Sequence, residues 1–176
     1  MRHSGRCDGC GSTVEPMTDQ TPAVYPSHPP EPIMRLMNSL LPRLLRTPLA
    51  GGARKQFMVL GFNGRKSGRR FTITVRAHLI DEVLYALAGS VWTVNFRGGG
   101  PAEVLYDGKT KPMTGELIED PAAVAELFHR CATGYGVSRA QRMMGVKFRD
   151  PRVPTLEEFR AAAVENNFVA IRFTPA

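Results

Sequence analysis

Apolar and polar positions change their period along the chain, and the change divides it into a tail and a folded part. Residues 1–32 hold six prolines among serines, threonines and glycines, without an apolar period. This composition predicts a flexible tail that buries no core. From Ile33 to Leu45, apolar residues recur at intervals of three and four with arginines between them, which predicts an amphipathic basic helix. Pro42 lies inside this stretch and should break or kink it.

Strand patterns fill the middle of the chain. Residues 56–62 form a buried apolar run that ends at a strong turn signal, Asn63-Gly64. Residues 71–80 alternate strictly, with a core face of Phe71, Ile73, Val75, Ala77 and Leu79 and a polar face of Thr72, Thr74, Arg76 and His78. Further strands are expected over residues 83–88, 102–106 and 111–118, the last two joined by the hairpin turn Asp107-Gly108. The pattern predicts an antiparallel meander of about five strands.

Two helices and a last strand follow. Asp120 before Pro121 is an N-cap signal, and an apolar stripe continues the helix to about Gly134. Thr155 and Glu158 have the spacing of a capping box that opens a second helix, which ends near Glu165. Residues 168–173 are a strand pattern that closes the chain.

Length and composition predict one domain, residues 33–176, behind the tail. The chain has 176 residues, of which 43% are hydrophobic, enough for a real core. It has no apolar run of about 20 residues and no apolar stretch of the secretory type at its start, so a cytoplasmic protein is expected. Residues 1–16 precede Met17, which begins an ordinary polar protein start, and we interpret them as an upstream extension outside the fold.

The cysteines do not predict a metal centre. Cys7 and Cys10, with His3 nearby, look like half of a zinc ribbon, but the only other cysteine is Cys131. A structural zinc site normally needs four ligands, so no metal is expected. Three thiols also fit a reducing compartment better than a secreted scaffold.

The charge predicts an anionic partner. The formal net charge is +7, and four cations, Arg65, Lys66, Arg69 and Arg70, fall within six positions. A nucleic-acid-binding surface usually spreads its cations and interleaves them with aromatics. The cluster therefore favours a local anion pocket, and no nucleic-acid partner is expected.

The segment Gly64-Arg65-Lys66-Ser67-Gly68-Arg69-Arg70 is the main candidate for chemistry. Its glycines let backbone amides approach an anion, its hydroxyl donates, and its cations neutralise phosphate or carboxylate charge. The spacing is not that of a P-loop, and no helix follows. Taken alone, the pattern is equally typical of a solvated polar loop.

The order of these pieces resembles the deazaflavin-dependent nitroreductase family. The resemblance covers about residues 33–173, and two motifs carry it: the Gly-Arg-Lys-Ser-Gly turn at 64–68 and the Trp-x-x-Asn-x-Arg segment at 92–97. It implies an α+β, mainly β fold, a split β-barrel of antiparallel strands with flanking helices, and the deazaflavin coenzyme F420 as cofactor.

The resemblance also implies roles for particular residues. The turn would hold the phosphate and acidic tail of the coenzyme with Arg65, Lys66 and Ser67, and Arg69 lies close by. Trp92 and Asn95 would lie beside the ring system. The family usually has a proline in the strand after the turn, and Thr72 and Thr74 stand here without one, as substitutes. The implied cofactor-binding residues are therefore Arg65, Lys66, Ser67, Arg69, Thr72, Thr74, Trp92 and Asn95.

Four of the residues singled out in the sequence have alternative interpretations. Trp92 and Asn95, without the resemblance, would be a core anchor and a turn residue. His78 is more simply a solvated or hydrogen-bonded histidine than an acid or base, because the sequence places no carboxylate beside it. Tyr135 follows the helix from Pro121, where relatives often present tyrosines to the substrate; it is the one catalytic candidate, with loop packing as the alternative.

These observations predict an oxidoreductase that passes a hydride between F420 and an electron-poor acceptor such as a quinone, enone or nitro compound. An alternative is a split barrel that binds FMN, haem or another anionic ligand without this turnover. A third hypothesis is a nucleic-acid or membrane-surface module; residues 33–46 predict at most a loose peripheral contact with the inner face of a membrane. The oligomeric state, monomer or homodimer, stays open.

Overall fold

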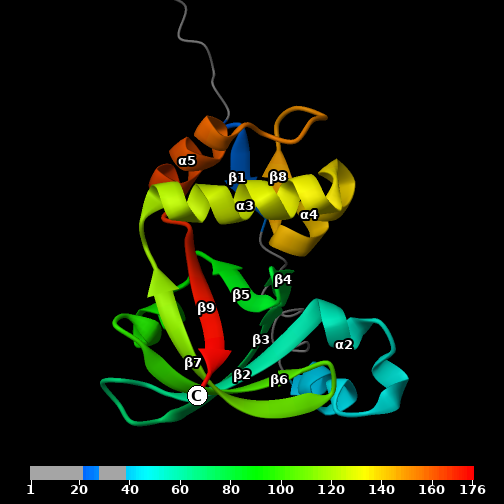
Figure 1. Cartoon of the computed structure of the whole chain (residues 1–176), viewed down its shortest axis with the longest axis vertical. Helices are drawn as coiled ribbons and strands as arrows, with labels where there is room; N and C mark the ends of the chain where they lie inside the picture. The colour runs from blue at the N-terminus through cyan, green and yellow to red at the C-terminus, as the bar shows by residue number, and fades with distance from the viewer. Residues whose placement is uncertain (1–21, 28–38) are drawn as a thin grey trace, which may run out of the picture.

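A computed structural model describes residues 22–27 and 39–176. His3, Cys7, Cys10 and the helix start at Ile33 lie outside the described residues. Within them, Figure 1 shows two parts, a curled sheet below and a layer of helices above it. No helix in the described ranges is both long and apolar enough to cross a membrane.

The sheet has seven antiparallel strands in the order β3-β2-β6-β7-β9-β5-β4. It confirms the expected fold class, a mainly β half-barrel with flanking helices. The strands are β2 (Phe57–Asn63), β3 (Arg70–Arg76), β4 (His78–Ile80), β5 (Val83–Ala88), β6 (Gly100–Tyr106), β7 (Lys109–Ile118) and β9 (Val169–Pro175). The order is not a plain meander, because β9 returns from the end of the chain to lie between β7 and β5.

The chain passes from one edge of this sheet to the other at Ala77. β3 pairs only with β2 at one edge, and β4 pairs with β5 at the other. A single residue joins them, so the sheet has to curl until its edges approach each other. The expected continuous strand over 71–80 is therefore wrong, and the side-chain alternation stops at the crossing.

The crossing reverses the expected faces of two residues. His78 is 1% exposed instead of lying on a solvated face, and Leu79 is 54% exposed instead of facing the core. Ile73 and Val75, which precede the crossing, do pack against the barrel core as expected. A one-residue change of direction moves every following side chain to the other face.

Local signals in the sequence predicted the turns and caps well. Asp107 and Gly108 have φ of 46° and 74°, the positive values that a two-residue hairpin turn requires. The Asp120 side chain accepts from the Ala123 amide at the start of α3 (Pro121–Tyr135). Thr155 and Glu158 form the capping box of α5 (Leu156–Glu165).

The helical layer holds its own core. Aromatic rings from α3, from α5 and from Phe168, the residue before β9, meet there. The rings of Phe128 and Phe168 are stacked, with 5.1 Å between their centroids. The layer also contains elements that the sequence analysis missed: α4 (Val137–Met144), β8 (Val146–Phe148) and β1 (Val24–Pro26). α4 and β8 are short, and each buries only two or three side chains, which leaves little periodic signal.

β1 corrects the interpretation of residues 1–32 as a tail without secondary structure. Val24 to Pro26 pair antiparallel with β8, and Val24 is fully buried in the core of the helical layer. Proline-rich composition hid this strand, because its one core residue shows no period. An edge strand also tolerates Pro26, whose ring removes one backbone donor.

Residues 39–45 are helical and pack on the outside of the sheet. The helix runs through Pro42 without the expected break within these residues. Leu45 and Ala50 bury their side chains against Val59 and Leu105 of β2 and β6. Ala50 belongs to the short helix η1 (Pro48–Ala50), which leads through α2 (Ala53–Gln56) into the barrel.

The burial of Val24 yields a stability prediction. Val24→Ala should lower the free energy of unfolding by roughly 2 kcal/mol, because it removes two methyl groups from a filled core. Urea denaturation of the full chain measures the change. Tyr25→Ala is the control, since Tyr25 lies on the exposed face of β1. Equal losses for both variants would contradict the placement of β1 in the core.

Candidate functional site

The cationic turn, residues 64–70, leads from β2 into β3 and is held in a compact shape by its glycines. The Gly64 amide donates to the Arg69 carbonyl and the Gly68 amide to the Gly64 carbonyl, both at 2.8 Å. A Cβ on Gly64 would lie 2.7 Å from the Phe71 ring, so no other residue fits without movement. Gly68 has φ of 64°, which glycine adopts without strain. All residues from Arg65 to Arg70 are exposed as a result.

The turn is tied to η2 (Val91–Phe96), the element formed by the second motif of the sequence. The Arg65 amide donates to Asn95 Oδ1 at 3.0 Å, and the Arg65 guanidinium donates to the Arg97 carbonyl. Asn95 is itself held by a 2.7 Å bond from Nδ2 to the Trp92 carbonyl. Two motifs separated by about 30 residues thus form one structural unit.

Phe96 anchors this unit in the barrel. Its ring is 1% exposed and lies 5.1 Å from the Phe62 ring and 5.8 Å from the Phe173 ring. A Cβ on Gly115 of β7 would come within 2.5 Å of the Phe96 ring. The absence of a side chain at Gly115 therefore makes room for Phe96, and Phe96 fixes the position of Asn95 next to it.

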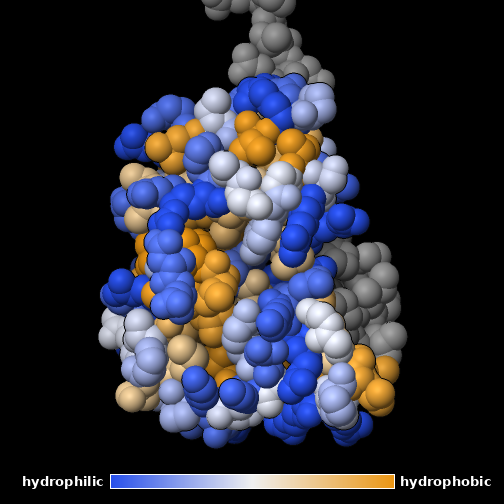
Figure 2. Space-filling model, turned by 45° about the vertical axis from the view of Figure 1, so that its right-hand side comes forward, coloured by the Kyte–Doolittle hydropathy of each residue, from blue (hydrophilic) through white to orange (hydrophobic). Residues whose placement is uncertain are grey.

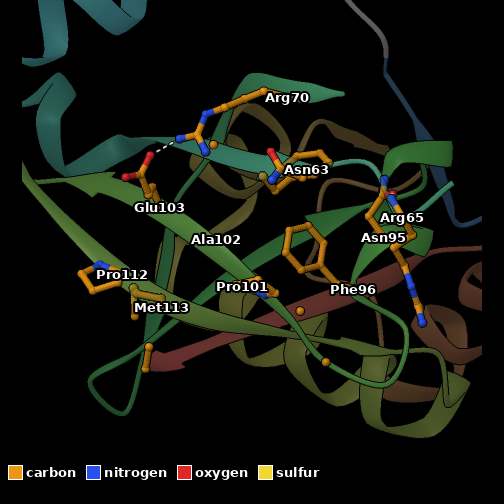
Figure 3. A pocket seen from close by; sticks show the side chains of 15 residues that line it. Asn63, Arg65, Arg70, Asn95, Phe96, Pro101, Ala102, Glu103, Pro112 and Met113 are labelled. Atoms are coloured by element: carbon orange, nitrogen blue, oxygen red, sulfur yellow. Dashed lines mark hydrogen bonds and ion pairs between the residues drawn. The ribbon is translucent and has the colours of Figure 1, made fainter. Parts of the chain in front are cut away.

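An open groove of about 380 Å³ begins beside the turn. Figure 3 shows Arg65 and Asn95 at one end, the Arg70–Glu103 ion pair at the other and Phe96 between them. Its lining is Gly61, Phe62, Asn63, Arg65, Arg70, Asn95, Phe96, Gly99, Gly100, Pro101, Ala102, Glu103, Pro112, Met113 and Ala176. The mixture of an apolar lining with polar groups at the ends is typical of small-molecule sites, and so is the volume.

The charges around the groove are unevenly compensated. Arg70 pairs with Glu103, and Arg97 pairs with Glu119, whose carboxyl pKa is lowered by the hydrogen bond from that guanidinium. Among the described residues, neither Lys66 nor Arg69 has a carboxylate partner. The Arg65 guanidinium is bound to a carbonyl, which leaves its charge uncompensated. Three cations beside the Ser67 hydroxyl fit a phosphate or carboxylate group.

Three other expected cofactor-binding residues, Thr72, Thr74 and Trp92, do not line the groove themselves. Thr72 is the register partner of Gly61, which lines the groove, and Thr74 is the partner of Val59, two residues away along β2. Trp92 is half-buried against the barrel core, with its ring 6.2 Å from Phe96; the groove is lined by Phe96 and not by Trp92.

Sequence reasoning missed Phe96, Glu103 and Met113 as groove residues. Phe96 could have been suspected, because it lies inside the Trp92–Arg97 motif. Glu103 and Met113 have no local signal, since each is one alternating position in a strand. Only the pairing of β2 with β6 and of β6 with β7 brings them to the groove.

Tyr135, the catalytic candidate, is not next to the turn. It ends α3, and its hydroxyl lies 3.2 Å from Nδ1 of His78 in β4. The turn ends at Arg70, whereas His78 follows Arg76, and the six residue steps of β3 from Arg70 to Arg76 span about 20 Å. Burial raises the pKa of Tyr135.

His78 is buried in a cationic setting. Burial, and secondly the charge of Arg76, lower its pKa to about 4. Its Nε2 atom has no hydrogen-bond partner among the described residues. Nearby, burial raises the pKa of the Cys131 thiol to about 12, so Cys131 is an inert core residue and not a reactive thiolate.

Comparison with known proteins identifies no family. No family model and no curated protein matches the chain. One matching solved structure is that of the conserved hypothetical protein Rv2991 from Mycobacterium tuberculosis. The identity is 16%, the match covers 85% of this chain and 82% of that one, and the TM-score is 0.40. A likeness of this extent leaves the function to be argued from the chain's own residues.

The buried histidine predicts a pH-dependent stability. In the unfolded chain His78 binds a proton below pH about 6.5, but in the folded protein only below about 4. The folded state is therefore destabilised as the pH falls through this window, by about 3 kcal/mol in total. The charge of Arg76 opposes protonation of His78, and Tyr135, whose pKa is raised by burial, brings no negative charge at this pH.

Urea denaturation at several pH values tests this expectation against His78→Gln. The variant lacks the titrating group, so its free energy of unfolding should fall less between pH 7 and pH 4. Carboxylates such as Glu158 titrate in both proteins and cancel in the difference. Parallel pH profiles for the two proteins would show that His78 does not stay neutral in the fold.

Proposed function

We propose that this chain is an oxidoreductase that transfers a hydride between the deazaflavin coenzyme F420 and an electron-poor organic acceptor, such as a quinone, an enone or a nitro compound. One observation carries the proposal. The cationic turn and the Trp92–Arg97 segment, the two motifs behind the family resemblance, are hydrogen-bonded to each other at the end of one groove. The element that would bind the tail and the groove that would take the planar ring are thus adjacent.

The turn would hold the phosphate and acidic tail of the coenzyme. Lys66, Arg69 and the Arg65 guanidinium offer uncompensated positive charge, and the Ser67 hydroxyl adds a donor. Charge-assisted hydrogen bonds of this kind are the stronger ones in proteins. Because the turn is fixed by its own backbone bonds and by Asn95, little ordering would be needed on binding.

The groove would orient the ring system and exclude water from one of its faces. Asn95 would contribute a polar group at the end of the groove and Phe96 an apolar wall, with Trp92 packed behind that wall. Thr72 and Thr74 would lie next to the ring system from the adjoining strand, β3. When bound, the reduced coenzyme would supply the hydride. The protein's part is then orientation and electrostatics, which explains why no protein nucleophile is required.

Solvent or the Tyr135 hydroxyl would supply the proton that accompanies the hydride. The contact with His78 Nδ1 would keep that hydroxyl oriented. Its distance from the turn along β3 means that Tyr135 acts only if acceptor and ring extend toward the helical layer.

A second candidate function is the binding of FMN or haem without this turnover. The uncompensated cations of the turn favour it equally, since a phosphate or a propionate would satisfy them. The two candidates differ in how many anionic groups the ligand brings. The F420 tail carries a phosphodiester and carboxylates, whereas FMN carries one phosphate.

A side-by-side fluorescence titration of the full chain with F420 and FMN distinguishes these functions. We expect F420 to bind at least tenfold more tightly, because each further charge-assisted contact is worth about a factor of ten. A preference for FMN, or no saturable binding of F420, would reject the oxidoreductase proposal in favour of the alternative.

The role of the turn has its own test. Lys66→Ala should weaken F420 binding by roughly tenfold to a hundredfold, because it removes a charge-assisted contact. The melting temperature should hardly change, since the side chain is exposed. Lys109→Ala removes the same charge from the hairpin after Gly108, away from the groove lining. If both variants weakened binding by the same small factor, only net charge would be at work.

A further inference from the structure

The positive charge of this protein comes from one continuous part of its chain. Between Glu31 and Asp81 there are ten arginines and lysines and not a single acidic residue. The rest of the chain holds 13 basic and 16 acidic residues, so it is slightly negative. Four of the ten cations belong to the cationic turn. Most of the others precede it, on the segment that packs outside the sheet.

That segment exposes leucines between its arginines. Leu45 and Ala50 anchor it in a small core, whereas Leu40, Leu44 and Leu49 are 54%, 43% and 86% exposed. Arg43 and Arg46 are exposed as well. We call Leu40, Arg43, Leu44, Arg46 and Leu49 the leucine–arginine surface. Figure 2 shows a small hydrophobic patch among hydrophilic side chains at the lower right, the side on which Figure 1 places α2.

We propose that the leucine–arginine surface docks the protein on the surface of an anionic lipid bilayer. Exposed leucines gain free energy by entering the boundary between headgroups and acyl chains, and arginines beside them attract anionic headgroups. Each leucine is free to insert, because its neighbours Leu45 and Ala50 already hold the segment to the barrel. A nucleic-acid surface would use the cations but would leave the leucines in water.

The position of the surface relative to the groove gives the docked protein an orientation. The segment covers Val59 and Leu105, which are paired neighbours in β2 and β6. Gly61 and Glu103, two residues further along the same strands, line the groove. Side chains two apart lie on the same face of a sheet. Docking would thus bring the groove close to the lipid headgroups. The inference does not depend on which cofactor the protein binds.

Vesicle flotation with the full chain tests the proposal. We expect the protein to float with phosphatidylcholine vesicles that contain phosphatidylglycerol and to stay behind with pure phosphatidylcholine. Raising the salt from about 0.1 M to about 1 M shortens the Debye length from about 10 Å to about 3 Å and should weaken binding without abolishing it, because the leucine contacts are not screened. Equal recovery with both vesicle types would overturn the proposal.

Matched variants assign the binding to this surface. Arg43→Gln with Arg46→Gln should weaken anionic-vesicle binding by about 25-fold, since each arginine contributes about fivefold near such a surface. Leu44→Gln with Leu49→Gln should weaken it at least tenfold. The controls are Lys147→Gln with Arg160→Gln, and Leu79→Gln with Val164→Gln, which change exposed residues elsewhere.

Two outcomes would reject the assignment. Equal losses for the control pairs would show that only net charge or general apolarity acts. Loss of vesicle binding in the arginine pair but not in the leucine pair, together with binding of a mixed-sequence oligonucleotide that the arginine pair also loses, would identify a nucleic-acid surface instead.

Discussion

The packing of the Phe96 ring over Gly115 is the contact on which the candidate site depends. A side chain at Gly115 would collide with the ring, and without the ring η2 would lose its one aromatic side chain that is fully buried in the barrel core. Asn95 precedes Phe96, and its side-chain oxygen accepts a hydrogen bond from the Arg65 amide. The shape of the cationic turn therefore depends on a contact in the core. A turn with four cations would otherwise be expected to fluctuate, because its charges repel one another. The site is thus a surface feature that the barrel interior holds in place.

The curl of the sheet is the second constraint, and it separates the polar groups into two regions. Because β3 leaves one edge of the sheet and β4 begins the other, the cationic turn lies at one end of β3 and His78 at the opposite end. The first region is exposed and positively charged, which suits recognition of an anion. The second is buried, and burial keeps His78 neutral; Tyr135 connects this histidine to the helical layer. Their chemistry differs because their solvation differs, although both contain basic residues.

Charge and apolar exposure together also distinguish two anion-attracting surfaces. The turn offers cations and a hydroxyl on a compact loop beside a groove, an arrangement for one small ligand. The leucine–arginine surface offers cations with exposed leucines, an arrangement for an extended interface. Both belong to the acid-free part of the chain, so they add to one positive field that draws anions toward this part of the protein.

The sequence by itself determined whatever depends on neighbours in the chain. Asp120 and the Thr155–Glu158 box set the starts of α3 and α5, Asp107-Gly108 set a hairpin, and the glycines at 64 and 68 set the cationic turn. These features need only local backbone geometry and hydrogen bonds, which a short stretch of residues specifies. The motif pair of the turn and the Trp92–Arg97 segment was also visible in the sequence, because each is compact.

Only the tertiary structure decided which of these pieces meet. The crossing at Ala77, the insertion of β9 between β7 and β5 and the pairing of Val24 to Pro26 with β8 depend on contacts between residues far apart in the chain. For this reason the alternation over 71–80 misplaced His78 and Leu79, and Pro-rich composition concealed β1. Glu103 and Met113 reached the groove through strand pairing alone. Local pattern fixes the conformation of a segment, but the burial of its side chains is settled by the surfaces that pack against it.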